Sequence, residues 1–266
     1  MDTALTDGRD RLDYVKKRLT AFDKDIFEFL SSKYTFYSDE YTNGTAFKRE
    51  YKFRVREGDL PPDLRFAFCD IVHHLASTCD NLLYALQLNY KVQRPRSNFP
   101  YYLKRTGKPS EQTFDRWDKR HPQIPPKVKQ AIELLQPFTS CTFAGETAIG
   151  KQHPIYILYK LWNEDKHAAP LTVQAAMNEI HLNTPAGKGS LFAHLMEFHP
   201  NTPLIDGAVF ATFITDKSFV FPITVPVYVV LDQNSPIAPS AKAFQLLDQL
   251  HGFVEGTVFK TLSSFL

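Results

Sequence analysis

Two short runs of this 266-residue sequence concentrate the side chains that could do chemistry. The first, DIVHHLASTCDN at residues 70–81, carries two carboxylates and two adjacent imidazoles. The second, LWNEDKH at residues 161–167, carries an amide, two carboxylates, an ammonium group and an imidazole. Imidazoles and carboxylates can exchange protons, bind metals or join hydrogen-bond networks. We define the polar cluster as eight of these residues: Asp70, His73, His74, Asp80, Asn163, Asp165, Lys166 and His167.

A structural network is the leading interpretation of the polar cluster. Both runs are amphipathic and are expected to lie on neighbouring helices. There, Asp80 or Asp165 would accept hydrogen bonds from His73 or Lys166. Buried polar groups need such partners, and the network that they form fixes the register of two helices. This interpretation predicts a non-catalytic role for the cluster.

A metal site is a weaker alternative that depends on spacing alone. Asp70 precedes His73 by three residues, as Glu164 precedes His167, and di-iron helical bundles use the same carboxylate–imidazole spacing. Such a site also needs carboxylates from two further helices, and short strings of this kind are frequent by chance. We therefore predict no metal and no other cofactor.

A basic loop between helices is the second candidate for a site. Residues 91–129 contain 11 Lys and Arg residues against three acids, a local net charge of +8 (11 − 3). Proline and aromatic residues are interspersed with these charges, and such a segment can bind nucleic acid or another anion. A solvated loop is the favoured alternative, because no helical periodicity orders the charges. The candidates for anion contact are Arg94, Arg96, Lys104, Arg105, Arg116 and Arg120.

Apolar periodicity predicts the helices that must position these side chains. Steps of three and four residues predict helices over residues 10–33 and 61–89, the second of which begins at a proline pair. Shorter helices are expected over residues 111–119, 127–136 and 154–167, and a closing helix over residues 241–265.

Strand patterns complete the predicted fold, which is α+β. Residues 47–55 alternate between apolar and charged side chains, as in a strand with one polar face. After residue 170 the segments are short and β-branched or aromatic, which predicts an antiparallel sheet of about four strands. The expected organisation is an N-terminal helical bundle (residues 1–170) and a small C-terminal antiparallel sheet with a closing helix (residues 171–266), packed on the bundle.

Composition predicts a protein of the cytoplasm with no membrane partner. The N-terminal residues are charged where a signal peptide is apolar. The most apolar run, residues 219–231, contains two prolines and is too short to span a bilayer. The three cysteines form no Cys-x-x-Cys motif, and their odd number favours a reducing compartment. Oligomeric state is left open, with a homodimer as one expectation.

Three motifs resemble those of an uncharacterised bacterial protein family. That family carries D-x-x-H-N-L-R-x-x-L-D-H-L, then L-Q-P-[YF], then N-x-D-K-H-R or N-x-x-D-K-H-R, and its elements follow the order expected over residues 10–262. Ala76 and Ala168 stand where the family has arginine, so chemistry that needs those arginines is not expected here. The matching positions are Asp70, His73, Leu75, Asp80, Leu82, Leu135, Gln136, Pro137, Phe138, Asn163, Asp165, Lys166 and His167.

The same resemblance is loosely to the HEPN-type helical domains of bacterial conflict systems, and it implies an RNase as an alternative. Such RNases use an arginine and a histidine four to six residues apart on a helix, and locally only Arg116 and His121 have that spacing. The leading prediction is a non-catalytic binding or structural protein, in a bacterial stress or defence setting. The alternatives are a HEPN-like RNase, a nucleic-acid-binding protein and a metal-binding helical bundle.

Overall fold

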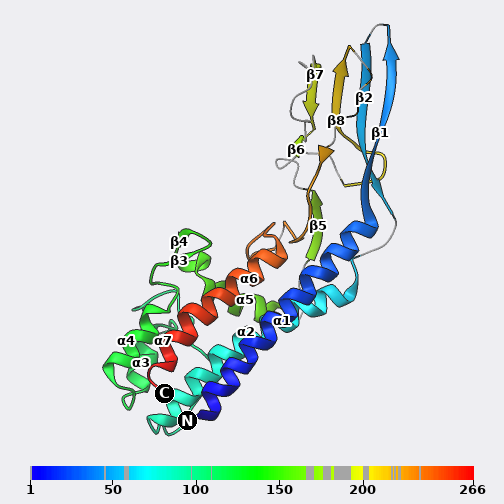
Figure 1. Cartoon of the computed structure of the whole chain (residues 1–266). Helices are drawn as coiled ribbons and strands as arrows, with labels where there is room; N and C mark the ends of the chain where they lie inside the picture. The colour runs from blue at the N-terminus through cyan, green and yellow to red at the C-terminus, as the bar shows by residue number, and fades with distance from the viewer. Residues whose placement is uncertain are drawn as a thin grey trace. The chain divides into compact units, whose positions relative to one another are not determined.

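The chain forms two compact units that interleave along the sequence (Figure 1). The helical unit comprises Met1–Asp23, Pro62–Leu171 and Leu231–Leu266, and the sheet unit comprises Lys24–Pro61 and Thr172–Val230. The sequence predicted a single boundary near residue 170. The computed structural model describes residues 2–44, 46–56, 60–96, 98–108, 110–165, 171–175, 181–182, 193–199, 204–216, 218, 220, 223–233 and 235–266.

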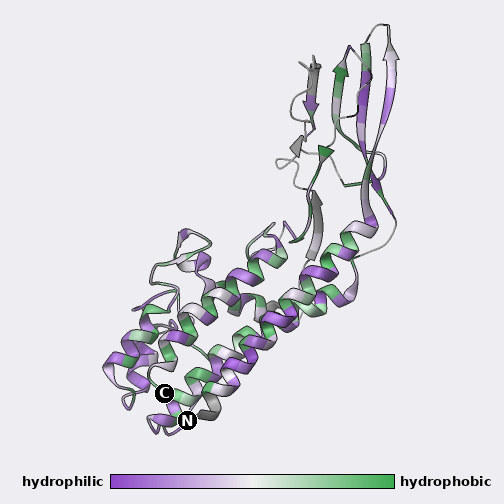
Figure 2. Cartoon of the chain, in the orientation of Figure 1, coloured by the Kyte–Doolittle hydropathy of each residue, from purple (hydrophilic) through white to green (hydrophobic). Residues whose placement is uncertain are grey.

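Helices α1 (Asp2–Lys33) and α2 (Pro62–Asn89) are the longest elements, and both follow the expected apolar stripes. Within the helical unit, Leu12, Val15, Leu19 and Phe22 of α1 are at most 4% exposed. The Phe22 ring lies 6.4 Å from that of Phe68 on α2. Figure 2 shows hydrophobic and hydrophilic residues recurring in turn along both helices. The amphipathic pattern therefore packs α1 against α2 as predicted.

The remaining helices of this unit are shorter, and most lie close to their expected positions. They are α3 (Phe114–Arg120), α4 (Pro126–Leu134), α5 (Pro154–Asp165), α6 (Ala243–Phe253) and α7 (Lys260–Ser263). A π-helical turn, η3 (Val254–Phe259), joins α6 to α7, so the closing helix is interrupted. The 3₁₀ turn η1 (Gly150–Gln152) precedes α5.

A small hairpin lies in a stretch between residues 136 and 154 for which the sequence predicted neither a helix nor a strand. Strands β3 (Cys141–Phe143) and β4 (Glu146–Ala148) pair antiparallel across a two-residue turn. Ala144 and Gly145 have φ angles of 54° and 82°, the left-handed values that this tight type of hairpin turn requires. Three-residue strands are too short to show an alternating pattern, and the periodicity therefore missed them.

The sheet unit contains a four-stranded antiparallel sheet with the order β1-β2-β8-β7 (Figure 1). Its strands are β1 (Tyr34–Asn43), β2 (Ala46–Val55), β7 (Ala193–Phe198) and β8 (Val209–Thr215). Strand β5 (Leu171–Ala175) pairs with β10 (Val227–Leu231), and β6 (His181–Leu182) with β9 (Ile223–Thr224).

The α+β class is confirmed, but the sheet is not confined to the C-terminal part of the chain. Two of its four strands, β1 and β2, precede α2 in the sequence. The alternation of β2 was recognised, whereas β1 was not, because the middle of β1 carries three consecutive polar residues, Ser38, Asp39 and Glu40. The partner of a strand is set by long-range pairing, which the local pattern does not encode.

One face of this sheet is an aromatic core. Phe53 of β2 and Phe210 of β8 have ring centroids 4.6 Å apart, and both side chains are at most 2% exposed. Tyr51 and Phe213 extend this core with a ring distance of 5.5 Å. Burial of such rings is a large stabilising contribution for a small sheet.

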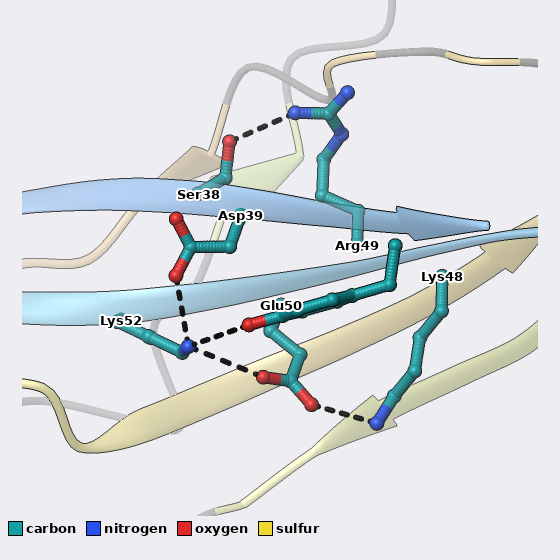
Figure 3. Close-up of polar contacts among 7 residues, drawn as sticks. Ser38, Asp39, Lys48, Arg49, Glu50 and Lys52 are labelled. Carbon is teal, nitrogen blue, oxygen red and sulfur yellow. Dashed lines mark hydrogen bonds and ion pairs between the residues drawn. The ribbon is translucent and has the colours of Figure 1, made fainter.

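The other face carries a network of charges across β1 and β2 (Figure 3). The Lys52 ammonium donates to Asp39 at 2.8 Å and lies 3.3 Å from Glu50, which also pairs with Lys48 at 2.6 Å. Hydrogen bonding to Asp39 is the main cause that raises the pKa of Lys52, and Lys48 is the main cause that lowers the pKa of Glu50. These opposite charges satisfy one another, so the network accounts for the strand's polar face.

Candidate functional site

Asp80, on α2, is the buried centre of the polar cluster. Its side chain is 7% exposed, and its Oδ1 accepts hydrogen bonds from the Tyr159 hydroxyl of α5 and from the backbone N–H of Phe99 at 2.7 Å. The Tyr159 hydroxyl also lies 3.3 Å from the carbonyl oxygen of Ala76. Burial raises the pKa of Asp80, and the two hydrogen bonds oppose that shift. Asp80 therefore joins α2 to α5 and to a loop segment.

Two buried glutamines hold the same loop segment from either side. Gln87 of α2 accepts from the backbone N–H of Arg96 at 2.9 Å and donates to its carbonyl oxygen at 3.0 Å. Gln136 accepts from the backbone N–H of Tyr102 and donates to the carbonyl oxygen of Pro100, both at 3.1 Å. Both glutamine side chains are fully buried. We call Arg96 and residues 98–102 the clamped segment, because three buried side chains bond to the backbone of Arg96, Phe99, Pro100 and Tyr102.

The clamped segment forms one wall of two adjoining cavities in the basic loop. The larger has a volume of about 570 Å³ and is lined by Tyr101, Tyr102 and Trp117 among others. The smaller, of about 340 Å³, extends from it toward Arg94. The residues lining both are Arg96, Arg120 and His121. The volume of the larger cavity falls in the range of small-molecule sites.

Three arginines at these cavities are free of acidic partners. Arg94, Arg96 and Arg120 are exposed, and none forms an ion pair with a carboxylate in the part of the chain that the structure describes. Four other cations of the loop are bonded to neighbouring groups. Lys104 lies 3.2 Å from Glu111, Arg105 pairs with Glu133, Lys129 lies 2.6 Å from Asp118, and Arg116 donates to the carbonyl oxygen of Glu111 at 3.0 Å.

The geometry thus divides the six anion candidates into two groups. Arg94, Arg96 and Arg120 line cavities, whereas Lys104, Arg105 and Arg116 bond to other parts of the loop. A guanidinium presents several N–H donors in one plane, which suits phosphate and carboxylate ligands. Only the first group is available for such a ligand.

His121 contributes a neutral group between the two cavities. Its Nδ1 lies 2.7 Å from the carbonyl oxygen of Trp117, so Nδ1 carries the proton and Nε2 is an acceptor. Burial is the main cause that lowers its pKa, and the charges of Lys129, Arg96 and Arg120 act in the same direction. Burial likewise raises the pKa of Tyr102. Both groups are therefore uncharged near neutral pH.

The outer residues of the polar cluster lie on the surface of α2. Asp70 accepts from Tyr14 and Arg18 of α1, each at 3.2 Å, and lies 3.4 Å from Nε2 of His74. His73 is exposed, and its Nδ1 accepts from the Trp162 indole at 3.2 Å. Burial lowers the pKa of His74, while the charge of Asp70 opposes this. These contacts tie α2 to α1 and to α5.

The second run of the cluster is described only in part. Asn163 donates to the Tyr101 hydroxyl at 3.0 Å, which links α5 to the clamped segment. The side chains of Glu164 and Asp165, and residues Lys166 and His167, lie outside the described residues. Within the described part of the chain, no three His, Cys, Asp or Glu residues are grouped as a metal ion would require.

Some key residues of the site were not singled out by sequence. Tyr159 is 1% exposed and lies in an apolar helical stretch, and Gln87 was not among the candidate residues. Ala76, one of the two departures from the arginine of the family motif, is fully buried with its carbonyl oxygen beside the Tyr159 hydroxyl. In this chain Asp80 is therefore satisfied by a hydroxyl and an amide, with no arginine.

Comparisons with protein-family models, with curated proteins and with solved structures find no match to this chain. The resemblance to the bacterial family stays a prediction based on its motifs. Among the described helices, none combines the length and apolar character needed to cross a bilayer.

Proposed function

We propose that this chain is a non-catalytic binding protein whose two adjoining cavities receive a phosphate-bearing polyanion, with nucleic acid as the expected partner. The observation that carries the proposal is the contrast between the two groups of cations. Arg94, Arg96 and Arg120 line the cavities without acidic partners among the described residues, while Lys104, Arg105 and Lys129 of the same loop are paired. Unpaired arginines at a cavity supply the charge that phosphate groups need.

The buried network supports a binding role because it fixes the cavity wall before any ligand arrives. Asp80, Gln87 and Gln136 satisfy the backbone of the clamped segment through hydrogen bonds of 2.7–3.1 Å. A wall held in advance loses little conformational freedom on binding, which favours affinity. In this proposal Asp80 is a structural residue, although burial raises its pKa.

The test compares two triple variants that remove the same charge from the same loop. Arg94→Ser/Arg96→Ser/Arg120→Ser removes the unpaired cations, and Lys104→Ser/Arg105→Ser/Lys129→Ser removes paired ones. The probe is a fluorescein-labelled single-stranded RNA of mixed sequence, followed by fluorescence anisotropy at several salt concentrations. We expect the first variant to lose binding and the slope of log Kd against log salt to fall by about 2, since each phosphate contact on a single strand contributes about 0.7.

Two results would contradict this function. Equal loss in both triple variants would show that the overall charge of the loop binds the RNA without the cavities. Absence of RNA binding by the wild type, together with no retention on heparin, would exclude a polyanion site altogether.

A HEPN-like RNase is the alternative that the same experiment separates from simple binding. Arg116 and His121 have the expected spacing, but Arg116 donates to Glu111 and His121 to Trp117. Cleavage of the labelled RNA by the wild type, abolished by His121→Ala, would favour the RNase. Intact RNA after binding favours the non-catalytic protein.

Setting and assembly are part of the proposal. Cys79 and Cys141 are free thiols, which supports a reducing compartment such as the cytoplasm. We also propose membership of the bacterial family whose three motifs the chain carries, and a stress or defence setting. A homodimer stays a prediction, and light scattering on the eluting protein would test it.

A further inference from the structure

The larger cavity is more than a positively charged surface, because aromatic rings form part of its lining. Tyr101 is half-buried and lines the cavity, and its ring stacks on Tyr159 at 4.9 Å with an angle of 11° between the planes. Tyr159 in turn stacks on Phe99 at 6.4 Å and 18°. The buried rings therefore hold Tyr101 in a fixed orientation at the cavity.

A second ring at the same cavity is supported in the same way. Trp117 lines the cavity and stacks on the buried ring of Phe114, with centroids 5.4 Å apart and planes at 28°. His121 lies 4.6 Å from Trp117 at an angle of 30°. Neither the phenol nor the indole can turn away without breaking these stacks. Trp117 is only 6% exposed, so the half-buried Tyr101 is the planar, preorganised surface that the cavity offers to a planar ligand group.

Neutral polar groups at the cavity complement the rings. The Nε2 atom of His121 is an acceptor, because Nδ1 donates to the Trp117 carbonyl oxygen. The amide of Gln112, exposed at the same cavity, can both donate and accept. Groups of this kind recognise the hydrogen-bonding edge of a heterocycle, and phosphate alone would not use them.

From these features we infer that the ligand is single-stranded nucleic acid, and that one unpaired base enters the larger cavity. The inference rests on the proposed polyanion function and adds the mode of recognition. The base stacks against Tyr101, while Arg96 and Arg120, shared by both cavities, hold the flanking phosphates. A base within a duplex is already stacked and paired, so it cannot enter without the cost of extrusion. A free phosphate leaves the aromatic part of the cavity empty.

The two cavities also set the direction in which the strand continues. The smaller cavity adjoins the larger through Arg96, Arg120 and His121, and Arg94 lies along it. A strand with one base inserted at Tyr101 would pass its next phosphate toward Arg94. We therefore expect a short binding site of a few nucleotides, at the lower end of the range for single-strand-binding proteins.

The experiment compares probes that share phosphates but differ in their bases. Anisotropy competition uses a single-stranded DNA decamer, the same decamer with abasic sites at all positions, its blunt duplex, and inorganic polyphosphate. We expect the single strand to bind at least about tenfold more tightly than the abasic decamer, since one stacked base is typically worth that much. The duplex and polyphosphate should compete weakly.

Variants of Tyr101 locate the effect in the cavity. Tyr101→Leu removes the aromatic face, and Tyr101→Phe keeps the ring but removes the hydroxyl that accepts from Asn163. We expect Tyr101→Leu to weaken single-strand binding about tenfold or more, Tyr101→Phe to retain it, and both to bind polyphosphate as the wild type does. Unchanged polyphosphate binding also shows that each variant is folded.

The outcomes distinguish base insertion from polyanion binding alone. If the duplex, the abasic decamer and the single strand bind equally, and Tyr101→Leu has no effect, base insertion is overturned while the polyanion function stands. If no probe binds to the wild type, both the proposed polyanion function and this inference are contradicted. Preference for the single strand that is lost in Tyr101→Leu and kept in Tyr101→Phe supports both.

Discussion

The backbone N–H of Phe99 donates a 2.7 Å hydrogen bond to Oδ1 of Asp80, nineteen residues earlier on α2. This bond connects the polar cluster to the basic loop, which the sequence presented as two separate candidates. The carboxylate has no direct contact with a ligand in the proposed function. It holds the segment whose neighbouring residues line the cavities, and the following predictions test that arrangement.

Asp80→Ala and Asp80→Asn should differ strongly in stability. Alanine leaves the Phe99 N–H and the Tyr159 hydroxyl without their common buried acceptor. We expect a loss of about 2 to 4 kcal/mol in the free energy of unfolding, because each unsatisfied buried group costs about 1 to 3 kcal/mol. Asparagine keeps an acceptor oxygen and should cost about 1 kcal/mol or less. Urea unfolding at pH 7 measures both, and equal losses would show that the bonds contribute little.

Tyr159→Phe should reveal coupling with Asp80. The substitution removes the hydroxyl that reaches Asp80 and the Ala76 carbonyl oxygen, but it keeps the ring stacked between its neighbours. We expect a loss of about 1 to 2 kcal/mol for the single variant. The loss of unfolding free energy in the double variant with Asp80→Ala should be smaller than the sum of the losses in the two single variants, as is usual for residues in contact. Strict additivity in a double-mutant cycle would indicate that the two side chains act independently.

Gln136→Leu should loosen the cavity wall. Its side chain bonds to the backbone of Pro100, Tyr102 and Ile132 at 3.1 Å each. The loss of a fully buried glutamine with three partners should destabilise the chain by about 2 to 3 kcal/mol and weaken RNA binding. The matched control is Gln152→Leu, an exposed glutamine, which should stay within about 0.5 kcal/mol. Thermal unfolding and anisotropy together check the prediction. If Gln136→Leu bound RNA as tightly as the wild type, the hydrogen bonds of Gln136 would not be needed for RNA binding.

His153 should make the stability of the helical unit depend on pH. The side chain is fully buried, its Nδ1 accepts from the Ile155 N–H at 3.2 Å, and its Nε2 has no partner among the described residues. Burial lowers the pKa of His153 from 6.5 to about 4. The unfolded chain therefore takes up a proton between these pH values while the folded chain does not. The stabilisation is complete above about pH 6.5 and is lost as the pH falls to about 4, by about 3 kcal/mol.

His153→Asn tests this pH dependence without removing the acceptor. Asparagine cannot titrate, so the loss of stability between pH 6.5 and about 4 should shrink by about 3 kcal/mol. His73→Asn is the control, because it replaces an exposed imidazole and leaves the buried ring in place. Urea unfolding across this pH range measures the slope. Identical slopes for the wild type and His153→Asn would contradict the assignment.

The sequence by itself determined the elements that carry the site. The apolar stripes of α1 and α2 could be predicted because one buried face of a helix repeats every three or four residues. The apolar residues of these stripes, from Leu12 to Phe22 and from Leu64 to Leu86, are buried as that repeat requires. The β2 strand could be predicted because its apolar and charged side chains alternate with the two-residue period of a strand. Composition placed the excess positive charge in residues 91–129. These are local properties, and local patterns are sufficient to predict them.

Tertiary structure alone decided which polar residues are buried and what they bind. On α2, His73 and Asp80 are seven residues apart and therefore lie on the same side of the helix, yet the first is exposed and the second is buried beneath Tyr159 and Phe99. Likewise, Arg105 and Arg120 look equivalent in the loop, but only Arg105 meets a carboxylate, that of Glu133. Such contacts join residues far apart in the chain. They depend on the path of the backbone in space, and no spacing within a single segment encodes that path.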